Sequence, residues 1–182
     1  MYPRGTRYNI VIMRSETTIQ GDQLANALRF LGINFVMGGS YTPETIHKHP
    51  AMLIRAISQS KEARLRLSLI PLFLDHPWFA KVVPQTDRKL LTPERLTLLC
   101  YYTAAVYFQR KFLFSIEKKL ELPDLFSKEL QLETQSDPDE CLRALAVRHQ
   151  LLSQSYINWL GTYQHAAQIW LREKSNNTIK NG

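Results

Sequence analysis

Cysteine is scarce in this chain, which holds two among 182 residues. Cys100 and Cys141 lie far apart, and each falls within a helical pattern. Two thiols cannot build a disulfide framework or a four-thiolate zinc site, so we expect small core hydrophobes in a reducing compartment. Glycine is also sparse, at seven residues, and no phosphate loop or dinucleotide fingerprint occurs. No serine or cysteine lies in a recognisable nucleophile elbow.

Signals for secretion or membrane insertion are missing as well. The apolar run at residues 8–13 is too short for a signal-peptide core and is followed by Arg14. The uncharged run at residues 96–109 is too short to cross a bilayer. The sequence therefore predicts a cytoplasmic protein without a membrane segment.

The composition is that of one globular domain, with 45% hydrophobic and 21% charged residues. We expect a single domain over residues 1–173, with a helical core over 42–173 and a disordered tail over 174–182. Three triplets have the form of helix starts, with a capping oxygen, a proline and an acid in turn. They are Thr42-Pro43-Glu44, Thr92-Pro93-Glu94 and Asp137-Pro138-Asp139.

The hydrophobic spacing predicts a mainly α fold, a helical bundle around a central apolar helix at about 92–116. Other helices are expected at 19–31, ended by Gly32, and at 51–58, after Pro50. A longer helix is expected at 61–74, with a kink or a freed carbonyl at Pro71. β-Branched runs at 8–13 and 33–37 suggest strands, which would make residues 1–40 a small β-α-β element.

The last helical region has the most regular spacing. From Leu142 to Trp170, apolar and aromatic residues alternate steps of three and four. Residues 138–173 form either one long helix or two helices with a break near Ser153-Gln154-Ser155. The aromatic members at positions 156, 159, 163 and 170 are candidate interface residues for a homodimer or a protein partner. These residues are Tyr156, Trp159, Tyr163 and Trp170.

Charge is uneven along the chain, whose net charge is +7. Residues 1–91 carry an excess of basic residues, and residues 117–140 carry an excess of acidic ones. A basic half indicates an acidic partner, so nucleic acid is a candidate ligand. The candidate contact residues are Arg55, Lys61, Arg64, Arg66, Arg88 and Lys89.

A glycine turn ends in Gly38-Gly39-Ser40 after a helix and an apolar run. Residues 23–40 resemble the entry to bacterial minimal nucleotidyltransferases, in which such a turn positions nucleotide phosphates. That family needs two nearby carboxylates for divalent metal, and the acids that follow here, Glu44 and Glu62, are not paired. The resemblance therefore implies at most a non-catalytic relative.

Arg143 and His149 have the spacing of an Arg-x(4–6)-His motif. In this respect the chain resembles HEPN-type helical ribonucleases, in which the arginine and histidine act on an RNA phosphodiester without metal. The residue after the arginine is Ala144, where a polar residue is usual in that family. On a straight helix the two side chains would lie about 120° apart, and His149 shares the apolar spacing, which is typical of a hydrogen-bonded core histidine.

Metal ligation is poorly supported. His47 and His49 lie two positions apart, and such residues point away from each other on a helix. We expect neither a metal nor a cofactor. The leading hypothesis is a non-catalytic helical binding or regulatory protein of a prokaryotic cytoplasm. The alternatives are a metal-independent HEPN-type ribonuclease and a nucleic-acid-binding protein that uses the basic half.

Overall fold

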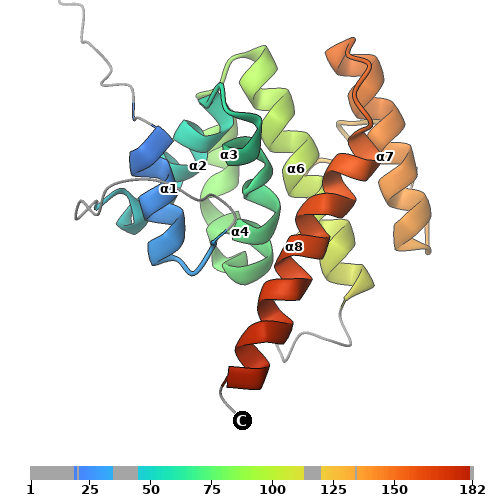
Figure 1. Ribbon diagram of the computed structural model, residues 1–182. Coiled ribbons are helices and arrows are strands. Elements are labelled where there is room, and N and C mark those ends of the chain that lie inside the picture. Colours follow the sequence, from blue (N-terminus) through green and yellow to red (C-terminus); the bar gives the residue numbers. More distant parts are fainter. Residues whose placement is uncertain (1–18, 20, 35–44, 113–119, 134, 181–182) are drawn as a thin grey trace, which may run out of the picture.

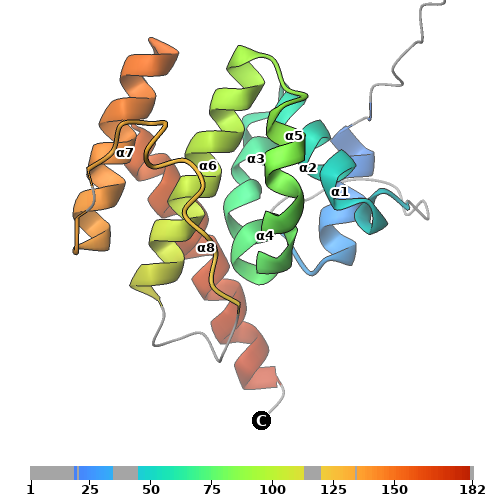
Figure 2. The ribbon, with the colours of Figure 1, turned by 180° about the vertical axis from the view of Figure 1, so that it is seen from behind.

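The computed structural model describes residues 19, 21–34, 45–112, 120–133 and 135–180, and every regular element in these ranges is a helix. The prediction of a mainly α fold is confirmed. Helix α6 (Thr92–Lys111) runs through the middle, with α1 (Gly21–Phe30) to α4 (Leu69–Asp75) on one side and α7 (Pro138–Ser153) on the other (Figure 1). The reverse view shows the same order (Figure 2).

The first helix, α1 (Gly21–Phe30), matches the predicted helix at 19–31. It ends in a Schellman motif: Ile33 N–H donates to Leu28 O, and Gly32 N–H donates to Arg29 O, both at 2.9 Å. The φ of Gly32 is +78°, which glycine adopts without strain. Ile33 and Asn34 are not in a strand. The rest of the expected β-α-β element lies outside the described residues, as do Gly38-Gly39-Ser40 and the first capping triplet.

The next elements are η1 (Ile46–Lys48) and α2 (Pro50–Gln59). Pro50 occupies the first turn of α2, as expected for a residue whose φ is already helical and which has no N–H to satisfy. The buried face of α2 contains Leu53, Ile54 and Ile57. This helix confirms the one predicted at 51–58.

The prediction of one continuous helix at 61–74 is wrong, although Pro71 does disturb the helix as expected. Two helices occupy this region, α3 (Ala63–Leu67) and α4 (Leu69–Asp75). Pro71 cannot donate to the carbonyl of Leu67 four residues earlier, and its ring crowds that oxygen. The chain therefore breaks at Ser68, whose N–H turns back to the carbonyl of Leu65 at 3.1 Å. The segments η2 (Pro77–Val82) and α5 (Val83–Asp87) follow.

Helix α6 (Thr92–Lys111) is buried without interruption from residue 98 to residue 109. It contacts α2, α4, α5, α7 and α8. The helix ends at Lys111, and the remainder of the predicted 92–116 segment extends into residues that are not described. Leu91 occupies the N-cap position and no side chain caps the helix, so the capping role expected for Thr92 is wrong. Thr92 is already in the first turn because the carbonyl of Leu91 accepts the N–H of Arg95 at 2.8 Å.

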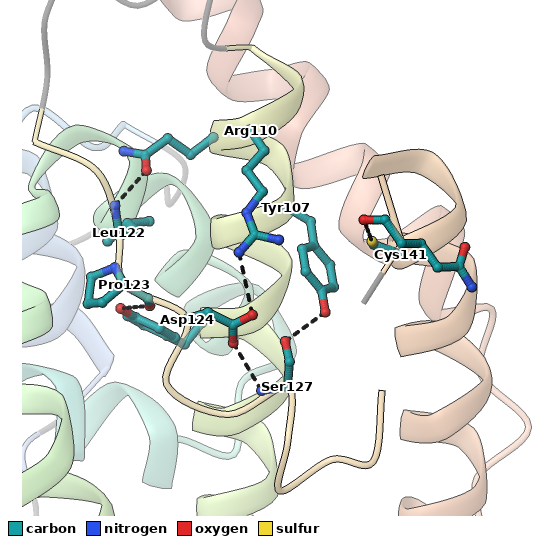
Figure 3. Close-up of polar contacts among 10 residues, drawn as sticks. Tyr107, Arg110, Leu122, Pro123, Asp124, Ser127 and Cys141 are labelled. Carbon is teal, nitrogen blue, oxygen red and sulfur yellow. Dashed lines mark hydrogen bonds and ion pairs between the residues drawn. The ribbon is translucent and has the colours of Figure 1, made fainter. Parts of the chain in front are cut away.

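The acidic connection after α6 is irregular, as expected, but it is firmly attached to α6 (Figure 3). The amide of Gln109 bonds two residues near the start of this connection: Nε2 donates to Leu120 O at 3.0 Å, and Oε1 accepts from Leu122 N at 2.6 Å. The hydroxyl of Tyr102 donates to Pro123 O at 2.8 Å. The buried Gln109 therefore has a structural role.

A second group of contacts holds the same connection further along. Tyr107 and Ser127 share a hydrogen bond between their hydroxyls at 2.7 Å (Figure 3). Asp124 accepts the backbone N–H of Ser127 at 3.1 Å and lies 3.4 Å from the guanidinium of Arg110. Much of the polar chemistry of this region is thus used in holding the chain together.

Helices α7 (Pro138–Ser153) and α8 (Trp159–Lys180) resolve the last region into two helices. Gln154 separates them with a left-handed φ of 52°, at the break considered in the sequence. The Asp137 cap is confirmed, since its Oδ1 accepts the N–H of Asp139 at 3.0 Å. The steady apolar spacing does not form one continuous buried face, because Leu152 and Tyr156 are exposed.

The prediction of a disordered tail over 174–182 is wrong for residues 174–180, which continue α8, and residues 181–182 lie outside the described residues. Asp75 on α4 anchors α8: the ammonium of Lys174 lies 2.6 Å from Asp75 Oδ1, and Trp170 Nε1 donates to the same oxygen at 3.1 Å. Among the described helices, none has the length and apolarity needed to span a membrane.

Candidate functional site: a cationic pocket between α2 and α5

A pocket of about 490 Å³ lies between the start of α2 and helix α5. The two helices lie side by side (Figure 2) and pack against each other. The side of α2 contributes Pro50, Ala51, Met52 and Arg55, preceded by Lys48 and His49, and the side of α5 contributes Val82, Gln85, Thr86 and Lys89. The volume falls in the range of small-molecule sites.

The backbone at the start of α2 adds positive potential to the pocket. Pro50 fixes the helix start, and His49 is the N-cap residue without a side-chain cap. The first α-helical bond runs from Leu53 N–H to His49 O at 3.0 Å. The N–H groups of Ala51 and Met52 precede that bond and have no intrahelical acceptor. They lie at the positive end of the α2 dipole.

Three permanent cations line this pocket: Lys48, Arg55 and Lys89. The two lysines are exposed and Arg55 is half-buried. None of the described lining residues is acidic. The Thr86 hydroxyl donates to Val82 O at 2.8 Å, which leaves the exposed Gln85 amide as a neutral side-chain donor. Such a set of donors favours an anion.

The predicted nucleic-acid residues separate into two groups. Arg55 and Lys89 line the pocket, and Arg88 is exposed next to Lys89. Lys61 and Arg64 follow the other end of α2, and the two ends of this helix lie roughly 15 Å apart at 1.5 Å per residue.

The second group is partly committed to local contacts. Arg64 forms a 2.9 Å ion pair with Glu62, and Arg66 donates to Ser60 O at 2.7 Å. Lys48, Gln85 and Thr86 were not predicted from the sequence, and His49 was considered only as a metal ligand. Pro50, which marks the start of a helix, could have indicated Lys48 and His49, whereas Gln85 and Thr86 had no such signal.

His149, the histidine of the ribonuclease alternative, is a core residue that is 3% exposed. Its Nδ1 shares a 2.6 Å hydrogen bond with the hydroxyl of Tyr163, and its ring stacks on Trp159 with centroids 3.6 Å apart. Burial lowers the pKa of His149 to about 3. The imidazole is therefore neutral at pH 7 and joins α7 to α8.

Arg143 does not lie beside His149. It is exposed on α7 and forms an ion pair with Glu140 one turn away. The structure does not bring the two motif residues together within one chain. Burial also raises the pKa of the Cys100 thiol to about 12, so this cysteine carries no thiolate at neutral pH. Both cysteines are buried free thiols, as the sequence predicted.

The four candidate interface aromatics have different surroundings. Tyr163 and Trp170 are buried in the core of this chain, which accounts for their helical spacing without a partner. Trp159 is partly buried against the core, through its stack on His149. Tyr156 is fully exposed.

The histidines near the pocket do not form a metal centre. The ring of His47 stacks on Phe30 with centroids 5.1 Å apart. Among the residues that the structure describes, no group of three or more His, Cys, Asp or Glu side chains could hold a metal ion.

Comparison with known proteins gives no relative from which a role could be carried over. No protein-family model, curated protein sequence or solved structure matches this chain.

Proposed function

We propose that this protein acts by binding rather than by catalysis, and that its ligand presents a phosphate group to the cationic pocket. The observation that carries the proposal is the convergence of the exposed Lys48 and Lys89 on one pocket without a described acidic lining residue. The start of α2 opens into the same pocket.

Phosphate is the anion that these donors fit best. Helix N-termini bind phosphate through backbone N–H groups, and lysine and arginine add charge-assisted hydrogen bonds. The pocket volume exceeds that of a single phosphate and leaves room for the body of a nucleotide. Met52 and Val82 supply apolar surface for such a body.

The groups that could do chemistry support a binding role. His149 is neutral and buried, Arg143 is paired on the surface, and Cys100 is protonated. None of these three residues lines the cationic pocket. A general base needs access to the proton that it removes, which a buried His149 lacks.

Titration calorimetry with ADP, at about 0.15 M salt, tests the proposal. Lys89→Glu reverses one pocket charge and is expected to weaken binding by about tenfold or more. Lys61→Glu makes the same charge change at the far end of α2 and is the matched control, with affinity near that of the parent protein. Equal losses in both variants would show that the overall field, and not the pocket, attracts the ligand.

Nucleic acid is a second candidate source of the phosphate. The exposed Arg88 next to Lys89 could extend contacts beyond the pocket along a strand. A single-stranded oligonucleotide would then bind more tightly than ADP, with an affinity that falls steeply as salt rises. If ADP binds as tightly as the oligonucleotide and both depend weakly on salt, the ligand is a small phosphate compound.

A further inference from the structure

Half of the large apolar side chains that are exposed in the described part of the chain lie between residues 147 and 157. This elbow surface is formed by the end of α7 and the turn into α8. Its members are Val147 at 60% exposure, Leu151 at 64%, Leu152 at 43%, Tyr156 at 100% and Ile157 at 47%.

Hydrogen bonds and a ring stack fix the backbone that carries the elbow surface. The hydroxyl of Ser153 donates to His149 O at 2.7 Å and bonds the hydroxyl of Ser155 at 2.7 Å. On the α8 side, Asn158 Oδ1 accepts the N–H of Gly161 at 2.9 Å. The stack of Trp159 on His149 joins both sides. The exposed apolar side chains are therefore presented by a fixed backbone, so an occupant has little ordering cost to overcome.

Charge is sparse in this part of the protein. Arg148 is the one charged residue between positions 147 and 157, and its guanidinium donates to Gln131 Oε1 at 2.7 Å. No Lys, Arg, Asp or Glu follows it until Arg172, although the whole chain has a net charge of +7. A second copy of the same chain therefore brings few like charges to this surface. At the other end of the exposed face of α7, Glu140 and Arg143 neutralise each other.

The size of the elbow surface fits a small two-fold interface. Five side chains of this kind expose on the order of 500 Å², the upper range for the largest apolar patch of a monomer. With the surrounding polar rim, two copies would bury roughly 1,200 Å², the lower limit for specific association. Val147 and Leu151 lie four residues apart on one face of α7, so two antiparallel copies of α7 can pair about a two-fold axis.

We infer that the elbow surface is the contact between two copies of this chain in a homodimer. Its central residues are Val147, Leu151 and Tyr156. Helix α6 separates α7 from α2 (Figure 1), so the cationic pocket stays open in such a dimer. The inference is independent of the proposed phosphate ligand.

Sedimentation velocity over a range of protein concentrations tests this inference. The parent protein is expected to shift from monomer to dimer in the micromolar range. Leu151→Glu places one charge from each copy in the contact and is expected to weaken the dimer by roughly a hundredfold. Leu91→Glu is the matched control, since Leu91 is also an exposed leucine, at the start of α6.

The control variant should dimerise like the parent protein, and the far-ultraviolet circular dichroism of both variants should match that of the parent. A parent protein that stays monomeric at high concentration would overturn the inference and leave the surface to a different partner. A Leu151→Glu protein that is folded and as dimeric as Leu91→Glu would overturn it too.

Discussion

Lowering the pH from 7 to 4 should destabilise the fold through His149. The pKa of His149 is about 3 in the folded protein because the ring is buried, against 6.5 for an ordinary histidine. Since the folded pKa is the lower one, the unfolded chain binds more protons between these two values. The stability from neutral His149 is fully present above pH 6.5 and is lost as pH falls toward 3.

The size of the effect follows from these two pKa values. Each pH unit below the unfolded pKa costs about 1.36 kcal/mol of unfolding free energy, so the loss between pH 7 and pH 4 is about 3 kcal/mol. A domain of this size is stable by only about 5–15 kcal/mol. The titration of one histidine should therefore be visible in an ordinary unfolding experiment.

Urea unfolding at pH 7, 5.5 and 4 measures this loss. His149→Gln keeps a hydrogen-bonding side chain near Tyr163 and removes the titration. Carboxylates contribute to the pH dependence of both proteins, so the difference between them isolates His149. His165→Gln is the control, because His165 is exposed on α8, and it should follow the parent protein. Equal pH dependence in His149→Gln and the parent protein would refute the reasoning.

Three further predictions concern the Gln109 hydrogen bonds, the Gln154 turn and the buried cysteines. Gln109→Leu leaves the Leu120 carbonyl and the buried N–H of Leu122 without their amide partner and should lower the unfolding free energy by about 1–3 kcal/mol in urea titrations; no loss would show that water replaces the amide. Gln154→Gly removes the cost of a left-handed conformation at a non-glycine residue and should raise the unfolding free energy by about 0.5–1 kcal/mol; a lower unfolding free energy would show that Gln154 is not strained. Cys100 and Cys141 should react with a thiol reagent only after unfolding, whereas fast reaction of the native protein would contradict their burial.

The sequence predicted the helices well where local chemistry decides them. Asp137 and Gly32 act at helix ends, and Pro50 starts a helix, because capping and proline geometry depend only on adjacent residues. The uncharged run at residues 96–109 correctly indicated a buried helix. His149 was recognised as a core residue because apolar spacing reports which face of a helix is buried.

Features that depend on distant contacts could not be predicted in this way. The contact of residue 174 with Asp75 extends α8 into the expected tail, and it joins positions far apart in the chain. The cationic pocket likewise forms only when α2 packs on α5, so Lys48 and Lys89 had no common signal in the sequence.

The exposed elbow surface shows a related limit. Spacing assigned Tyr156 and Tyr163 to one face, but the left-handed Gln154 turns the chain between them. One tyrosine is consequently on the surface and the other in the core. The sequence indicated a possible break near Ser153-Gln154-Ser155, but the apolar spacing continues across it and no glycine or proline decides between one helix and two.

The cationic pocket can be tested most directly by following backbone amide resonances of the whole protein while inorganic phosphate is added at constant ionic strength. The account predicts saturable shifts concentrated at Ala51, Met52, Arg55 and Gln85, with little change on α7 and α8. Shifts that are absent, that do not saturate, or that are centred outside α2 and α5 would contradict the central claim.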